Sequence, residues 1–272
     1  MRNLHLQYKS ILILALCTFY LAFSSRSVAH NKATYLGNSA VLVESEGSKI
    51  LFDPFFHNNF GIYRLVPKTL YDAVMQGKAP YDDIDAIFIS HAHEDHFSAR
   101  DVQIYMEKFP NVLLFAPKQA IEKLAEPMTK INKERLIAFD LGFGDAPETQ
   151  KQGSLIVTAV RIAHAGWPSR KDIENIVFSV TMASGKVAMH MGDADPDVYH
   201  YLPYRAHWRD HPVDINFPPY WFFMSAQGRD IINEVLNVRK NVGVHVPLQI
   251  PKYLIEKQYE HFSSPGADIK LD

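Results

Sequence analysis

The hydrophobic and polar positions of the chain predict an alternation of strands and helices. Short apolar or alternating runs recur between residues 33 and 247, and most of them end at a turn-forming or polar residue. Apolar residues at helical spacing follow one of these runs most clearly at Val102, Tyr105, Met106 and Phe109. Strands that alternate with helices in this way favour an α/β protein.

The predicted elements fall into two halves with the same order. Strands are expected over residues 34–36, 40–43, 50–52, 85–89, 112–117, 136–139, 153–162, 176–182, 187–191, 213–217 and 242–247, and helices around 70–76, after 98, over 118–125 and over about 228–238. The polar turn region 142–153 separates the halves, which we place at about 30–147 and 148–272 of a single domain. Each half would have a sheet with helices on one face, so the halves are expected to pack as a four-layer αβ/βα sandwich.

The first 29 residues have the features of a cleavable secretory signal. Arg2 and Lys9 precede an apolar run over 11–23, and small residues at 27–29 stand before His30. The run is shorter than the roughly 20 residues that span a bilayer, and an uncleaved anchor is the alternative. We therefore expect an exported protein, in a bacterial periplasm, that begins at His30.

Charge and cysteine content narrow the classes of function. Without the expected signal the chain has 25 basic and 30 acidic residues, a formal charge of −5. This balance disfavours a nucleic-acid partner, because phosphate backbones are held by clustered lysine and arginine. The single cysteine, Cys17, lies within the signal, so the mature chain would form no disulfide. Any metal site must then use histidine, aspartate or glutamate.

A cluster of metal-ligand types follows the apolar run 85–89. It consists of His91, His93, Asp95 and His96, and a capping-box-like helix start comes directly after it. The first two histidines are two positions apart, so they point to the same side of an extended chain, while the last two side chains can face a second centre. Imidazoles and a carboxylate suit a divalent ion such as zinc. A polar loop with solvated histidines is the alternative.

Further ligand types lie at the ends of other expected strands. They are Asp53, His164, Asp193 and His245. By its local sequence Asp53, which precedes a proline, could equally be a turn-forming residue. A lone histidine at a strand end, such as His164, is usually structural. His190 is expected to pack or to hydrogen-bond behind Asp193.

This ordered series resembles the metallo-β-lactamase superfamily, and the resemblance covers nearly all of residues 33–247. The segments Leu36-Gly37-Asn38, Asp53-Pro54 and His245-Val246-Pro247 are most similar to the branch with ascorbate-6-phosphate lactonases and N-acylphosphatidylethanolamine phospholipase D. The missing cysteine departs from the β-lactamases that use a thiolate on the second metal, which argues against antibiotic hydrolysis.

The resemblance implies a binuclear metal site. It assigns His91, His93 and His164 to the first ion, Asp95, His96 and His245 to the second, and Asp193 to a bridge between them. Zinc is the expected metal, with manganese and then iron as alternatives. The candidate catalytic residues are Asp95, which could accept or relay a proton, and Asp53, which would lie near the metals without binding them.

We therefore expect a metal-dependent hydrolase that acts on a small ester, lactone or phosphodiester, with an acyl or lipid part as one option. Two ions about 3.5–4 Å apart would lower the pKa of a shared water, which then attacks a carbonyl or phosphoryl centre. The alternatives are a mononuclear iron oxygenase, whose second ligand set would be incomplete, and a non-catalytic metal-containing binding protein. The sequence does not predict the oligomeric state.

Substrate choice is expected to depend on three loops beside the ligand-bearing strand ends, 55–63, 167–171 and 199–221. The candidate contacts are Trp167, Arg170, Tyr199, Arg205, His207 and Tyr220. Among the cations of these loops, Arg170, Arg205 and Arg209 could bind a phosphate or carboxylate group.

Overall fold

The computed structural model describes residues 31–124 and 131–271. The signal expected at 1–29, its cleavage site and the last residue of the helix expected at 118–125 lie outside the described residues. Among the helices of the described part, none is long and apolar enough to cross a membrane.

The first sheet contains seven strands in the order β13-β1-β2-β3-β4-β5-β6. They are β1 (Lys32–Gly37), β2 (Ala40–Ser45), β3 (Ser48–Phe52), β4 (Ala86–Phe88), β5 (Leu113–Pro117), β6 (Leu136–Phe139) and β13 (Asp268–Lys270). β1, β2 and β3 pair antiparallel, and β3 to β6 pair parallel. The carboxyl ends of the parallel strands therefore meet at one edge.

The second sheet contains six strands in the order β12-β11-β10-β9-β8-β7. They are β7 (Glu148–Gln152), β8 (Leu155–Arg161), β9 (Ile176–Thr181), β10 (Val187–His190), β11 (Val213–Phe217) and β12 (Val238–Asn241). β7 to β10 pair antiparallel, and β10 to β12 pair parallel. The change from antiparallel to parallel pairing repeats that of the first sheet, as the repeated sequence pattern predicts.

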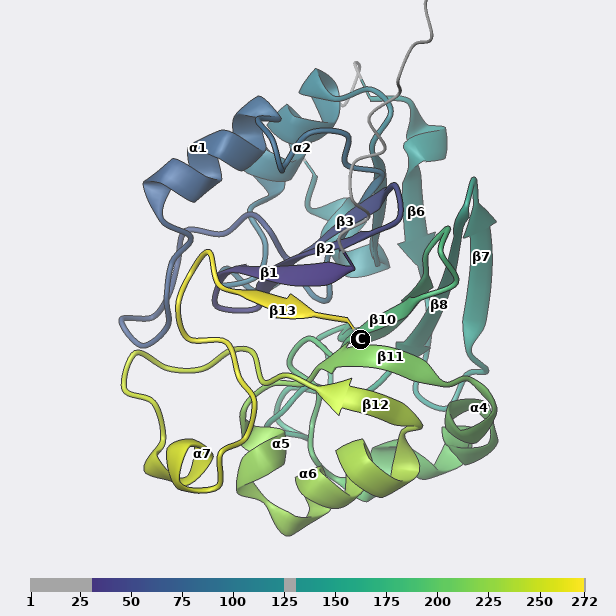
Figure 1. Cartoon of the computed structure of the whole chain (residues 1–272). Coiled ribbons are helices and arrows are strands. Elements are labelled where there is room, and N and C mark those ends of the chain that lie inside the picture. Colours follow the sequence, from purple (N-terminus) through teal and green to yellow (C-terminus); the bar gives the residue numbers. More distant parts are fainter. Residues whose placement is uncertain (1–30, 125–130, 272) are drawn as a thin grey trace, which may run out of the picture.

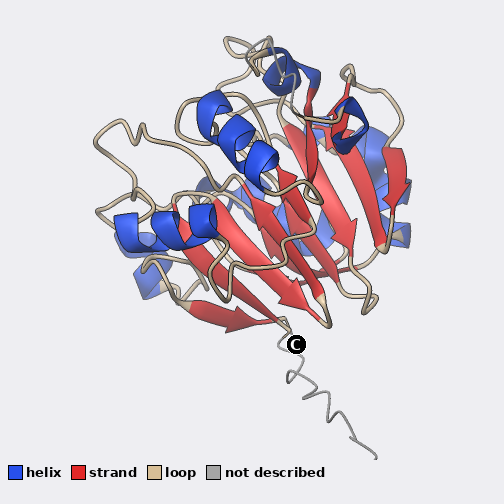
Figure 2. Cartoon of the chain, turned by 90° about the horizontal axis from the view of Figure 1, so that it is seen from above, coloured by secondary structure: helices blue, strands red, loops and turns tan. Residues whose placement is uncertain are grey.

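Helices cover the outer face of each sheet, and the two sheets face one another (Figures 1 and 2). The first half has α1 (Lys68–Gln76), α2 (Ala99–Lys108), α3 (Lys118–Glu122) and the 3₁₀ turn η1 (Lys133–Arg135). The second half has η2 (Val198–His200), η3 (Leu202–Tyr204), α4 (Arg205–Asp210), α5 (Trp221–Met224), α6 (Ala226–Asp230), the π-helical turn η4 (Ile231–Val235) and α7 (Lys252–Glu256). This arrangement confirms the four-layer αβ/βα sandwich.

The alternation of side chains along the strands divides the core into layers. In β3, Phe52 packs between the sheets, with its ring centroid 5.1 Å from that of Phe88 and 6.4 Å from that of Phe217 of the second sheet. Its neighbour Leu51 points to the opposite face and joins the core beneath the helices. Both faces of the sheet are therefore buried, which explains why its strands read as nearly continuous apolar runs.

Three element predictions are corrected. Residues 148–152 form strand β7 rather than a turn; this strand pairs only with β8 at the sheet edge, so it needs no apolar pattern. Residues 242–247 are not a regular strand, because β12 ends at Asn241 and the next segment makes only isolated bridges, one of them to Pro219, which has no N–H to donate. The helix expected over 228–238 is a series of short turns from 221 to 235.

The C-terminal strand β13 returns to the first sheet and pairs antiparallel with β1. The strands otherwise divide as expected, since β6 belongs to the first sheet and β7 to the second. The second half thus supplies one edge strand to the sheet of the first half.

Candidate metal centre

The histidine-rich segment lies where the chain leaves the carboxyl end of β4 and enters α2. Ser98 begins the helix as its N-cap and accepts a hydrogen bond from the backbone N–H of Asp101, as the capping-box pattern predicts. On the other side, Ser90 anchors the segment to the second half, because its carbonyl accepts the backbone N–H of Ile176 at 2.9 Å. The ligand segment is therefore held from both sheets.

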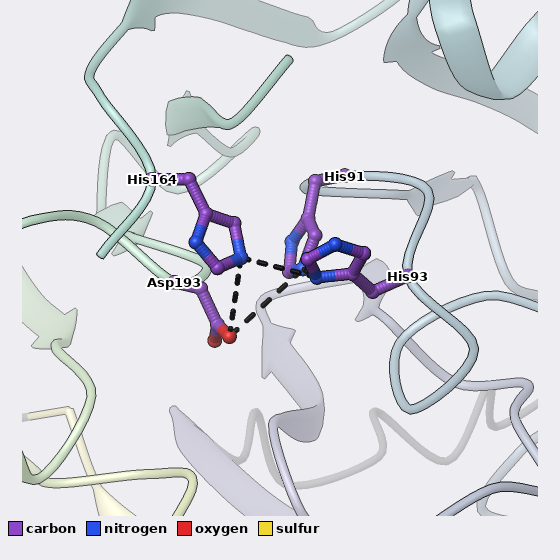
Figure 3. Close-up of side chains that lie close together, drawn as sticks. All are labelled: His91, His93, His164 and Asp193. Atoms are coloured by element: carbon purple, nitrogen blue, oxygen red, sulfur yellow. Dashed lines mark hydrogen bonds and ion pairs between the residues drawn. The ribbon is translucent and has the colours of Figure 1, made fainter. Parts of the chain in front are cut away.

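The first ligand group consists of His91, His93, His164 and Asp193 (Figure 3). His93 Nδ1 lies 3.1 Å from the Nε2 atoms of both His91 and His164. Asp193 Oδ2 lies 3.9 Å and 3.5 Å from the same two Nε2 atoms. An ion about 2.0–2.1 Å from each atom in tetrahedral geometry would separate its ligand atoms by about 3.3 Å, which matches this spacing.

The second group consists of Asp95, His96 and His245. His245 Nε2 lies 3.1 Å from Asp95 Oδ2, and His96 Nε2 lies 3.7 Å from the same oxygen. Asp193 joins this group through its other oxygen, since Oδ1 is 3.1 Å from His96 Nε2 and 3.3 Å from His245 Nε2. One carboxylate thus faces both groups, in the manner expected of a bridging ligand.

Two buried atoms of the centre support a bound cation. His96 Nε2 and Asp193 Oδ1 are inaccessible to water and lie 3.1 Å apart, but the geometry between them is not that of a hydrogen bond. Although burial opposes it, His245 and His96 hold the pKa of the Asp193 carboxyl well below its usual range. Buried polar atoms without partners are costly, and a divalent ion would satisfy both.

The protonation states also suit a metal site. Burial lowers the pKa of His91 and His164, and lowers that of His93 to about 4, so these imidazoles are neutral near pH 7. His96 differs: burial opposes its charge, but Asp193 and Asp53 raise its pKa well above the usual range. In the metal-free protein, protonated His96 therefore supplies the positive charge beside the carboxylates of Asp193 and Asp53.

Asp53 holds His96 from behind and does not reach the cavity. Its side chain is buried and accepts hydrogen bonds from Ser90 N at 2.7 Å, from Ser90 Oγ at 2.6 Å and from His96 Nδ1 at 2.8 Å. The expectation that Asp53 lies near the metals without binding them agrees with this placement. The carboxylate is buried and is not among the residues that line the cavity at the metal centre, so we assign Asp53 a positioning role.

Asn38 is a positioning residue that the sequence did not single out for this task. Its Nδ2 donates to the carbonyl of Asp95 at 2.9 Å, and its own carbonyl accepts the N–H of His245 at 3.0 Å. It also has a left-handed backbone, with φ of 43°, a conformation that asparagine tolerates well. Behind the site, His190 Nε2 donates to the carbonyl of Ser39, its Nδ1 accepts the N–H of Gly192, and its ring stacks on Phe52, as expected of a packing residue.

A cavity of about 370 Å³ opens onto the metal centre. It is lined by Phe60, Ile62, Tyr63, His93, Asp95, Arg170, Asp193 and His245. Of the six predicted substrate contacts, Arg170 alone belongs to this lining. Ile62 and Tyr63 were not predicted as contacts; they lie in the expected loop 55–63, where the aromatic content was the available signal.

The other predicted contacts lie away from the cavity lining. Arg205 lines a separate hollow beside residues 233–237, and His207 stacks on its neighbour His211, so the structure brings neither side chain to the cavity lining. Tyr199 is 74% exposed and is also outside the lining.

Trp167 and Tyr220 flank the site without lining the cavity. The indole of Trp167 packs edge-on against Phe143 and His200. Tyr220 packs against Trp221, whose ring centroid is 5.3 Å from that of His245. These two aromatics lie beside the cavity rather than in its lining, and their contact with a substrate stays a prediction.

The chain belongs to the beta-lactamase superfamily, since the family model described as "Beta-lactamase superfamily domain" matches residues 32–216. A UPF0173 metal-dependent hydrolase of Anoxybacillus flavithermus is 27% identical over 165 residues, which is 60% of this chain and 63% of that protein. The match thus spans less than two thirds of that relative's length.

Two further similarities cover a larger share of the chain. The N-acyl-phosphatidylethanolamine-hydrolyzing phospholipase D 1 of Caenorhabditis elegans is 21% identical over 238 residues, covering 82% of this chain and 67% of that protein. The crystal structure of a possible metal-dependent hydrolase from Veillonella parvula has a TM-score of 0.61 at 11% identity, covering 89% of this chain and all of that chain. The first similarity agrees with the expected branch, and the second shows the fold.

Proposed function

We propose that this protein is a metal-dependent hydrolase with two divalent ions, zinc being the metal that fits the donor set best. The observation that carries this proposal is the shared carboxylate of Asp193, whose two oxygens face two separate ligand groups. A mononuclear oxygenase would not need the second group. The names of the curated relatives support hydrolysis as the reaction class.

When bound, the ions would supply Lewis acidity and an activated water at neutral pH. The chain's own contribution includes a proton acceptor in the cavity. Asp95 Oδ2 faces Asn38 and His245, whereas its Oδ1 has no hydrogen-bond partner among the described residues. Asp95 Oδ1 can therefore take a proton from the attacking water and pass it toward the leaving group.

The substrate class is a small ester, lactone or phosphodiester. The cavity volume of about 370 Å³ suits a small reacting group. Phe60 and Ile62 line the cavity and are 57% and 50% exposed. An apolar substituent of the substrate could therefore lie along them. The similarity to a phospholipase supports a lipid substrate as one form of this class.

The cellular setting follows from the N-terminal sequence alone. We propose that the chain is exported, because a basic start, a short apolar run and small residues precede His30. The acidic balance of the remaining chain supports a small-molecule rather than a nucleic-acid partner.

Metal analysis and a substrate panel test the proposed function together. Protein loaded with zinc and desalted should hold about two ions per chain and hydrolyse at least one ester, lactone or phosphodiester. His245→Ala should lose one ion and most activity, while His211→Ala, an exposed histidine outside the centre, should lose neither. In protein purified without added zinc, one iron per chain with occupancy unchanged in His245→Ala, and no hydrolysis, would favour the mononuclear oxygenase.

A further inference from the structure

The lining of the cavity separates into two kinds of residue. His93, Asp95, Asp193 and His245 belong to the ligand groups. The remainder comprises two apolar side chains, Phe60 and Ile62, and two polar ones, Tyr63 and Arg170. Outside the ligand groups, the described residues that line the cavity include no carboxylate or amide. Tyr63 and Arg170 therefore favour a substrate that presents acceptors, such as the oxygens of an anion.

Tyr63 is fixed beside the second ligand group. Its ring meets that of His245 edge-on, with the centroids 4.0 Å apart. A turn holds its backbone, since Tyr63 N donates to the carbonyl of Asn59 at 3.0 Å and Asn59 Nδ2 donates to the carbonyl of Tyr63 at 2.8 Å. The hydroxyl has no hydrogen-bond partner among the described residues, and Tyr63 lines the cavity. Its O–H is therefore available to donate to a substrate.

The loop that carries Tyr63 is bound to the segment that carries His245. Arg64 Nη1 donates to the carbonyl of Pro247 at 2.9 Å, and Leu248 N donates to the carbonyl of Ile62 at 2.8 Å. These bonds join backbone on both sides of the cavity mouth. The position of the Tyr63 hydroxyl is thus set before a substrate arrives, which is a requirement for an efficient donor.

Arg170 supplies the positive charge of the cavity. Its aliphatic stem lies against Gly166, where a Cβ would be 3.4 Å from Arg170 Cδ, and Gly166 has φ of 92°. The guanidinium makes one long contact, 3.5 Å from Nη1 to the carbonyl of Ala165, so most of its donors remain available. Arg170 lines the same cavity as Tyr63, His93 and Asp193, so its charge faces the metal centre.

We propose that Tyr63 and Arg170 form an anion-binding subsite that selects a phosphodiester over a neutral ester or lactone. This inference rests on the proposed hydrolase function. Arg170 binds the charge that the substrate already carries, and Tyr63 donates a hydrogen bond to the oxygen that gains charge during attack. Water adds its oxygen to phosphorus, the bond to the alcohol oxygen breaks, and a proton from the water ends on that alcohol. Tyr63 keeps its own proton throughout.

Two substrates with the same leaving group test this selectivity in zinc-loaded protein. They are bis(4-nitrophenyl) phosphate, which is an anion, and 4-nitrophenyl acetate, which is neutral. Arg170→Gln should raise KM for the phosphodiester about 10- to 100-fold, the loss expected for a charge-assisted contact, and change the ester kinetics less than about twofold. Tyr63→Phe should lower kcat about 10- to 100-fold with little change in KM, because its bond strengthens in the transition state.

Arg205→Gln and Tyr199→Phe are the matched controls, since both positions lie outside the cavity lining. They should leave both reactions unchanged, and all variants should retain the zinc content and melting temperature of the wild type. Equal losses on both substrates in Arg170→Gln would overturn the selectivity. A Tyr63→Phe variant with wild-type kcat would remove Tyr63 from the proposal.

Binding of inorganic phosphate, measured by calorimetry, separates this inference from the proposed function. Arg170→Gln should weaken phosphate binding about 10-fold or more, and Arg205→Gln should not. If the wild type cleaves the ester but not the phosphodiester, the hydrolase function stands and the anion subsite is refuted. If it cleaves neither, yet binds phosphate through Arg170, the subsite stands and the hydrolase function fails.

Discussion

Replacing Asp53 by asparagine tests whether a side chain outside the cavity sets the metal affinity of the second ligand group. The bond from His96 Nδ1 to the Asp53 carboxylate, 2.8 Å long, keeps the ring proton on Nδ1 and leaves Nε2 free for the metal. An amide can still accept the N–H of Ser90, but it then turns its NH₂ group toward His96. Nδ1 must become an acceptor, and the ring proton moves to Nε2.

Asp53→Asn should weaken the affinity for the ion of the second ligand group about 10- to 100-fold, which corresponds to about 1.4–2.8 kcal/mol. The first group should be spared. His91 Nδ1 lies 3.0 Å from Ser90 Oγ, and this hydroxyl can accept from both His91 and the new amide. His91 therefore keeps its proton on Nδ1 and its Nε2 free.

Competition between the protein and a zinc chelator measures the two affinities separately. Asp85→Asn is the matched control. The Asp85 side chain accepts one hydrogen bond, 2.8 Å long, from the backbone N–H of Lys49, and an amide oxygen can keep this bond. Asp85 lies along the sheet from the metal centre. The control should bind both ions as the wild type does. Equal weakening of both sites in Asp53→Asn, or two wild-type affinities, would refute the assignment of Asp53 as the residue that orients His96.

Three further outcomes are expected. Gly192→Ala should destabilise the fold by at least about 1–3 kcal/mol in urea unfolding, because Gly192 has φ of 55° and a Cβ there would lie 2.4 Å from Asn175 Oδ1. Metal-free protein should lose thermal stability as the pH falls from 6.5 toward 4. Burial lowers the pKa of folded His93 to about 4, so the unfolded chain takes up the proton first. His93→Gln should make the melting temperature depend less on pH in this range. Exported protein should begin at His30 in intact-mass measurements, and a product that still contains Arg2 would show an uncleaved anchor.

The histidine-rich segment of the metal centre was predictable because its residues follow a local rule. His91 and His93 stand two residues apart directly after a buried strand, and this spacing suffices to place both on one side. Asp193 and His164 also follow strands, β10 and β8, that end at the same edge of the second sheet. Their assignment as metal ligands nevertheless came from the family resemblance, because a residue at a strand end is more often structural.

The parts that escaped prediction depend on contacts between distant segments. Tyr63 reaches the cavity because the backbone N–H of Leu248 binds the carbonyl of Ile62 in the same loop. A local sequence pattern does not predict a hydrogen bond between residues so far apart in the chain. His245 was expected at the end of a strand but lies in an irregular segment with φ of 57°, held by the carbonyl of Asn38. The sequence offered no feature that distinguishes Arg170, which lines the cavity, from Arg205, which lines a separate hollow.

The pairing of β13 with β1 has a consequence for the order in which the molecule can assemble. Lys32 pairs with Lys270, so the first sheet gains this edge strand only after residues 268–270 have been synthesised. Until then the outer edge of β1 offers unpaired backbone groups to any other extended chain. Contacts so distant in sequence form slowly. During synthesis the early half should therefore depend on chaperones or on delayed folding, and a chain shortened before residue 268 should aggregate through its first strand.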